Sequence, residues 1–188
     1  PRAEEVKTAA SVRELVSPMM RRFHTPHDLV PRTHVLSNGR YAVMITGAGS
    51  GYSRWRNLAV TRWREDVTCD SWGTYIFLRD VREGNVWSAG YQPSGVKPDR
   101  YEVEFREDRI EIVRRDGTIS TTLDVAVSPE ADAEVRRVSI SNLGNHAREI
   151  ELTSYAEVVL APPAADAAHP AFSKLFVQTE FVADVGAL

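Results

Sequence analysis

The sequence predicts an all-β fold, an antiparallel β-sandwich preceded by one N-terminal helix. Three observations predict it: apolar and polar residues alternate along much of the chain, short turn sequences separate the alternating runs, and only one segment has a helical period. Alternation with a period of two is typical of strands with one face on a core and one in water. Repeated strands without intervening helices indicate a sandwich or a barrel.

Residues 4–22 form the predicted helix. Their apolar positions recur at about 3.6-residue spacing, with acidic residues at the start and Arg21 and Arg22 at the end. This order of charge suits the helix dipole. Pro18 interrupts the pattern, so the helix is expected to kink there or to stop near Ser17.

An extended connector with two prolines is predicted at residues 24–34. We therefore expect residues 1–33 to hold the helix and connector, and residues 34–188 to hold the β-sandwich. The chain starts with Pro1 rather than Met. We expect it to be an excised piece of a longer protein, with the sandwich truncated at its C-terminal end.

The strands are predicted where the alternation is clearest, with turn residues between them. The alternating runs are 101–106, 110–112, 119–127, 138–141 and 150–160, the last unusually long, followed by a loop at 161–170 and a last strand around Phe172–Phe181. The turn signals are 37–39, 83–85, 116–117 and 142–145.

Composition excludes several classes of protein. A chain of 188 residues is long enough to bury roughly 70% of its unfolded surface, so a core of its own is plausible. The net charge of −3 gives no basic surplus for nucleic acid or for a membrane surface. The single cysteine, Cys69, excludes an internal disulfide and fits a reducing compartment, so we expect a cytoplasmic location.

Three glycines, Gly47, Gly49 and Gly51, raise the question of a nucleotide-binding loop. A dinucleotide fingerprint needs Gly-x-Gly-x-x-Gly, and Tyr52 stands where its third glycine belongs. A phosphate-binding loop needs Gly-Lys-Ser/Thr, and this stretch contains no lysine. Both templates fail. The glycines fit a β-turn or bulge, or a loop whose backbone closely approaches a ligand.

Aromatic and arginine side chains gather around these glycines. A pyranose has apolar C–H faces and a rim of hydroxyls, so aromatic rings flanked by planar guanidinium groups suit a sugar site. The alternative is that the tryptophans pack in the core, which composition alone favours. The candidate sugar-binding side chains are Tyr52, Arg54, Trp55, Arg62 and Trp63, with Gly47, Gly49 and Gly51 as loop backbone.

Four motifs in the chain carry a family resemblance: "GSGYSRW", "TRWRED", "WGTYIFLRD" and "HPAFSKLFVQTEF". From about His34 to Phe181 the sequence resembles the N-terminal domain of glycoside hydrolase family 94, formerly the glycosyltransferase 36 group. Within that family it is most similar to the phosphorylase-like region of cyclic β-1,2-glucan synthases.

The resemblance implies an antiparallel β-supersandwich of galactose-mutarotase type. Family members join it to a helical linker and an (α/α)6 barrel, and they cleave β-glucosidic bonds with inorganic phosphate and inversion. The barrel carries the general acid, so we expect this chain alone to be an inactive part of a hexosyltransferase. The implied partners are a β-glucan oligosaccharide, phosphate, the barrel and a second subunit, and the resemblance is compatible with a parent protein tethered to the inner membrane.

No residue of the chain is a good candidate for catalysis or for binding a metal. Glu65, Asp66, Asp70 and Glu157 are better explained by loop hydrogen bonds or a solvated face than by general-acid chemistry. His24, His27 and His34 lack the ligands that would complete a zinc site, and no mutarotase-like histidine–glutamate pair is recognisable. We expect no cofactor.

We therefore expect a non-catalytic sandwich domain of a β-glucan-processing transferase, which supports the barrel, the dimer and the sugar site. Two alternatives remain open at this point. One is an autonomous carbohydrate-binding module, and the other is a purely structural domain with buried aromatic residues.

Overall fold

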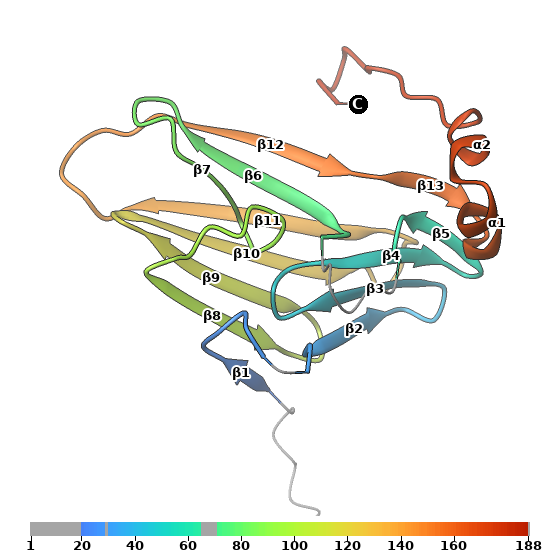
Figure 1. Ribbon diagram of the computed structural model, residues 1–188, viewed down its shortest axis with the longest axis horizontal. Helices are drawn as coiled ribbons and strands as arrows, with labels where there is room; N and C mark the ends of the chain where they lie inside the picture. Colours follow the sequence, from blue (N-terminus) through green and yellow to red (C-terminus); the bar gives the residue numbers. More distant parts are fainter. Residues whose placement is uncertain (1–19, 29, 65–70, 188) are drawn as a thin grey trace, which may run out of the picture.

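The computed structural model describes residues 20–28, 30–64 and 71–187, and it consists almost entirely of antiparallel strands (Figure 1). The strands in chain order are β1 (Arg21–Phe23), β2 (Thr33–Ser37), β3 (Tyr41–Thr46), β4 (Gly51–Trp55), β5 (Leu58–Thr61), β6 (Thr74–Asp80), β7 (Val86–Ser88), β8 (Arg100–Phe105), β9 (Ile110–Asp116), β10 (Ile119–Val127), β11 (Glu134–Asn142), β12 (Ile150–Ala156) and β13 (Val158–Ala161). Two short helices follow, α1 (Pro163–Ala168) and α2 (Pro170–Lys174).

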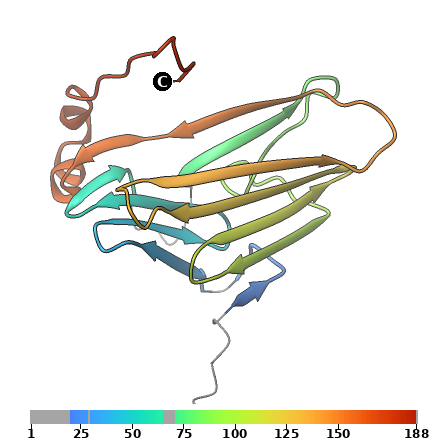
Figure 2. The same cartoon turned by 180° about the vertical axis from the view of Figure 1, so that it is seen from behind.

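These strands make three antiparallel sheets. Their orders are β1-β8-β9-β10-β11, β12-β6-β7 and β13-β5-β4-β3-β2. Only Glu157 separates β12 from β13, so the chain passes directly from the second sheet into the third. Figures 1 and 2 show the connection from β11 to β12 at one end of the molecule and the two helices at the other. The predicted all-β antiparallel class is therefore confirmed.

The core lies between the first sheet and the other two. It is built from inward-facing residues of several strands, among them Val43 and Ile45 on β3, Val103 and Phe105 on β8, and Leu78 on β6, each at most 1% exposed. Burying one such side chain contributes about 1.5–3 kcal/mol of hydrophobic free energy. On β8, β9 and β10 the period-two alternation seen in the sequence corresponds to burial of about every second residue, whereas nearly all residues of β12, in the predicted run 150–160, are exposed.

The predicted hairpin turns are present at three of the four turn signals. The turn at 37–39 joins β2 to β3, the turn at 83–85 joins β6 to β7, and Asp116–Gly117 joins β9 to β10. Residues 142–145 instead start the long connection that crosses from β11 to β12. Within the described residues no helix is long and apolar enough to cross a membrane.

The predicted N-terminal helix lies largely outside the described residues, and its last part is wrong. Arg21 and Arg22 belong to strand β1, which pairs antiparallel with β8 so that Arg21 lies opposite Phe105. The guanidinium group of Arg22 forms an ion pair with Glu104 of β8. Cross-strand pairing therefore overrides the helical period at this end.

The other predicted elements that need correction lie near the C-terminus. The expected strand around Phe172–Phe181 is absent; instead α2 begins at Pro170, and the chain then continues without regular strand. Proline at the first helical position favours a helix start. The long run at 150–160 is two strands, with Glu157 between them.

Candidate functional site

The glycine-rich stretch forms the turn of the β3–β4 hairpin, as the β-turn interpretation of these glycines expects. Only residues 47–50 form the turn, in which Gly49 adopts φ +91° and donates its amide to the Thr46 carbonyl at 3.0 Å. Gly51 already belongs to β4, with φ +153°, and a Cβ there would overlap the Met44 carbonyl. These glycines allow close packing of the protein's own backbone.

Strand β4 sends its side chains to two different faces. Trp55 and Ser53 face the first sheet: the indole Nε1 of Trp55 donates to Asp132 at 2.6 Å, and the Ser53 hydroxyl donates to Glu134 at 2.5 Å. Tyr52 and Arg54 are the alternate residues and point to the outer face. The structure therefore separates Trp55 from the other candidate residues.

On that outer face lies a cavity of about 480 Å³, which we call the β4–β5 pocket. Its aromatic wall is made by Tyr52 and Trp63, whose ring centres are 5.7 Å apart at an interplanar angle of 60°. Helix α1 covers the pocket on one side. The lining residues are Tyr52, Arg54, Ala59, Thr61, Trp63, Arg64, Pro163, Asp166 and Ala167.

Arg62 lies beside this pocket and holds α1 in place. It is only 4% exposed, and its guanidinium forms a double hydrogen bond with Asp166 of α1, through Nη2 at 2.6 Å and Nε at 2.9 Å. Its Nη1 donates to Glu157 at 2.5 Å. Hydrogen bonding to Asp166 raises the pKa of Arg62, and hydrogen bonds from Arg62 lower the pKa of Asp166. The guanidinium and the Asp166 carboxylate are therefore both charged near neutral pH.

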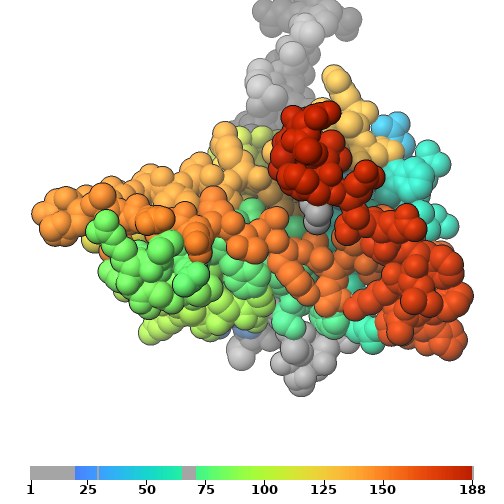
Figure 3. Space-filling model, turned by 90° about the horizontal axis from the view of Figure 1, so that it is seen from above, coloured from blue at the N-terminus to red at the C-terminus, as the bar shows by residue number. Residues whose placement is uncertain are grey.

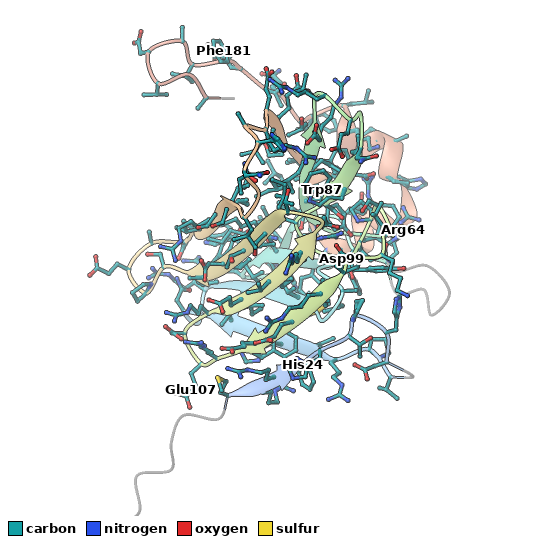
Figure 4. All side chains as sticks on the ribbon, turned by 90° about the vertical axis from the view of Figure 1, so that its left-hand side faces the viewer. His24, Arg64, Trp87, Asp99, Glu107 and Phe181 are labelled. Carbon is teal, nitrogen blue, oxygen red and sulfur yellow. The ribbon has the colours of Figure 1, made fainter. Side chains whose placement is uncertain are left out.

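Two other arginines, Arg54 and Arg64, line the pocket. Among the described residues Arg54 has no ion-pair partner, and its buried Nε has no hydrogen-bond acceptor. Arg64 lies over the ring of Trp72 at 5.9 Å, beside the helices (Figure 4). A buried guanidinium nitrogen without an acceptor is costly, so a hydroxyl-rich ligand would gain from meeting it.

The histidines of the connector have structural contacts. His34 stacks on Phe105 with ring centres 5.2 Å apart, and its Nε2 lies 2.7 Å from the Arg106 carbonyl. His27 packs edge-on against Tyr91. No group of three or more side chains suited to a metal ion occurs in the parts of the chain that the structure describes.

Asp166 and helix α1 belong to this site, although neither is among the residues that the sequence pattern predicts for it. The stretch "PPAADAA" lies in the predicted loop at 161–170, yet a proline at the first helical position followed by alanines is a helix signal. The pairing of Arg62 with Asp166 spans 104 positions in sequence, and no local pattern predicts such a contact. Glu65, Asp66 and Asp70 lie outside the described residues.

Fold and pocket together define the class: an antiparallel β-sandwich domain with an aromatic and cationic pocket on its outer face. Residues 16–188 match the supersandwich domain of glycosyl hydrolase 94. The chain belongs to that family.

Named relatives agree with this assignment. The chain is 43% identical over 167 residues to the cyclic beta-(1,2)-glucan synthase NdvB of Rhizobium meliloti (strain 1021). The aligned region is 89% of this chain and 6% of that protein. It is 30% identical over 168 residues to the N,N'-diacetylchitobiose phosphorylase of Vibrio furnissii, covering 83% of the chain and 20% of that protein. A third relative is the 3-O-beta-D-glucopyranosyl-beta-D-glucuronide phosphorylase of Paenibacillus borealis, 28% identical over 68% of the chain and 16% of that protein. The chain thus spans no more than a fifth of these relatives.

Proposed function

We propose that this chain is the non-catalytic sandwich domain of a β-glucan-processing transferase or phosphorylase, and that its β4–β5 pocket binds saccharide. The observation that carries the proposal is the pocket itself, in which Tyr52 and Trp63 form an aromatic wall beside Arg54. Its volume of about 480 Å³ falls in the roughly 300–1,000 Å³ range of small-molecule sites. The ring faces suit the C–H faces of a sugar, and the guanidinium donors suit its hydroxyls.

The charge state of the nearby carboxylates supports a binding role over a catalytic one. A general acid must carry a proton near neutral pH, which requires a raised pKa. Hydrogen bonds from Arg62 lower the pKa of Asp166, and Glu157 is held by the same guanidinium. Both carboxylates therefore suit an anchoring role for α1. Catalysis is assigned to a barrel elsewhere in the parent protein, where phosphate would also act.

Contacts with that barrel and with a second subunit are part of the same proposal. Large apolar side chains are exposed on α2 and the segment after it, including Phe172, Leu175, Phe176 and Phe181. Figure 4 shows Phe181 on a segment that extends away from the strands. Exposed apolar residues that cluster in this way are typical of surfaces that pack against another domain or subunit.

The test is saccharide binding by the 188-residue chain, measured by calorimetry with β-1,2-gluco-oligosaccharides. Trp63→Ala should weaken binding at least tenfold because it removes half of the aromatic wall. Arg54→Lys should weaken it by about 1–3 kcal/mol of charged hydrogen bonding, since lysine lacks the planar donor fork. Arg109→Lys, in the exposed β8–β9 turn, is the matched control and should bind as the wild type does.

The outcome also separates the alternative functions. Saccharide binding by the 188-residue chain alone would also fit an autonomous carbohydrate-binding module. The same variants in the full-length parent distinguish a domain of the enzyme from such a module, because only the former should change the saccharide-dependent activity. If no oligosaccharide binds and the parent variants keep full activity, the chain is a structural domain and the sugar-site proposal is wrong.

A further inference from the structure

The second and third sheets together form what we call the second layer, opposite the first sheet. A second aromatic cavity lies on this layer, next to the β4–β5 pocket. We call it the β6–β12 pocket; its volume is about 320 Å³. Tyr75 of β6 lies directly opposite Tyr155 of β12 in the sheet register, so the two side chains share one face, and Phe77 is on it too. Trp72 and Glu157 also line this pocket.

The ion pairs of Arg62 connect the linings of the two pockets, which have no described residue in common. Asp166 lines the β4–β5 pocket and Glu157 lines the β6–β12 pocket, and the guanidinium of Arg62 binds both carboxylates. Arg64 of the first pocket lies over Trp72 of the second at 5.9 Å. The Gly51 amide of β4 also donates to the Trp72 carbonyl at 2.8 Å.

We propose that the two pockets form one extended binding face, which takes a saccharide chain of several sugar units rather than a single unit. The proposal rests on the proposed saccharide function of the β4–β5 pocket. Figure 3 looks onto the side of β12 and β13, drawn in orange, which lead to the helices at the right. The proposed chain runs from the β4–β5 pocket past Arg62 to Tyr155.

The chemistry of the β6–β12 pocket fits a sugar ring. Tyr155 is 47% exposed, and its hydroxyl donates to Glu157 at 3.2 Å. Its exposed ring therefore lies next to groups that can form hydrogen bonds with a sugar. Trp72, Tyr75 and Phe77 add further aromatic surface. An aromatic side chain with a polar tip combines apolar contact with a fixed hydrogen-bonding group.

The charges along the proposed binding face favour a neutral saccharide over an anionic one. The carboxylates of Asp166 and Glu157 both lie at the junction, where they would repel a phosphate or a carboxylate passing between the pockets. Arg62 contributes one positive charge against these two carboxylates, so it offsets their charge only in part. The described lining of the β6–β12 pocket contains no arginine or lysine. A neutral glucan meets no such barrier.

The length dependence of binding tests the proposal on the 188-residue chain. Calorimetry is carried out with a series of β-1,2-gluco-oligosaccharides, from the disaccharide to the hexasaccharide. It gives the ratio of the affinity for the hexasaccharide to the affinity for the disaccharide. We expect at least a tenfold higher affinity for the hexasaccharide, because added units reach the second pocket. Tyr155→Ala should reduce that ratio to about one, whereas Trp63→Ala should weaken both ligands.

Two controls keep the result specific. Phe181→Ala removes an aromatic ring of similar exposure, 63%, outside both pockets, and should leave the ratio unchanged. Tyr155→Phe keeps the ring and should retain most of the ratio. If the disaccharide and hexasaccharide bind equally and Trp63→Ala weakens both, the extended face is wrong while the β4–β5 pocket stands. If none of the series binds, the proposed function itself fails, and this inference fails with it.

Discussion

At the scale of single residues, the side a side chain faces decides its role. Tyr52 and Trp55 are separated by only three positions, yet Tyr52 lines the outer pocket and Trp55 donates to Asp132 in the connection from β10 to β11. Arg62 and Arg54 also differ in role. The guanidinium of Arg62 is ion-paired with two carboxylates, whereas the Nε of Arg54 has no hydrogen-bond acceptor among the described residues. Residue type alone, therefore, does not identify a sugar-binding residue.

Gly51 gives a test of the glycine cluster at this scale. Its φ is +153°, and a Cβ would overlap the Met44 carbonyl, so Gly51→Ala should destabilise the fold by about 3 kcal/mol. Gly39→Ala is the matched control, because Gly39 also has positive φ, +89°, but a Cβ added there would meet no atom within 4 Å. It should cost only about 1 kcal/mol. Urea unfolding measures both; equal losses would contradict the steric explanation.

At the scale of elements, the site depends on how α1 is attached to the sheet. The helix has only six residues and no side-chain cap, so it is too short to be stable on its own. The buried pair of Asp166 with Arg62 connects it to the chain just after β5. One wall of the β4–β5 pocket is thus held by an ion pair.

This ion pair predicts a pH dependence. Hydrogen bonds from Arg62 lower the folded-state pKa of Asp166 below the ordinary value of about 3.9. The stabilisation is therefore fully present above about pH 4, and it is lost as the pH falls through the folded-state pKa. The free energy of unfolding should differ most between wild type and Asp166→Asn above pH 5, and the difference should shrink towards pH 3. A difference that stays constant across this range would contradict the role of the Asp166 charge.

The sequence predicts the strands better than the site, and the reason is physical. Alternation is local, so Tyr101, Val103 and Phe105 identify a half-buried strand without knowledge of its partners. The β4–β5 pocket depends on Asp166 meeting Arg62 across 104 positions, which alternation does not encode. The expected strand at Phe172–Phe181 has apolar residues at strand-like positions but no neighbouring strand to pair with among the described residues, and its first residues belong to α2.

At the scale of the whole molecule, the two pockets lie on the second layer, and the first sheet serves as its support. The residues that face the first sheet, such as Val43 and Leu78, are fully buried, while the outer face carries the arginines and aromatic rings. The proposed binding residues therefore lie on the opposite face of these sheets from the core. The names of the relatives differ in the saccharide they give, a cyclic beta-(1,2)-glucan for a synthase and N,N'-diacetylchitobiose for a phosphorylase. The proposed saccharide function implies that differences in such outer-face residues change saccharide preference without affecting the core.

The same division predicts that the 188-residue chain has no phosphorolytic activity. Incubation with β-1,2-glucan and inorganic phosphate should release no glucose 1-phosphate, because inversion requires a protonated general acid and both pocket carboxylates are ion-paired with Arg62. A phosphorylase of the family, assayed with its own substrate, shows that the product would be detected. Contaminating enzyme is excluded by an Arg62→Met variant purified in the same way. Release of glucose 1-phosphate that follows the wild-type chain and changes in that variant would mean that the sandwich itself is catalytic.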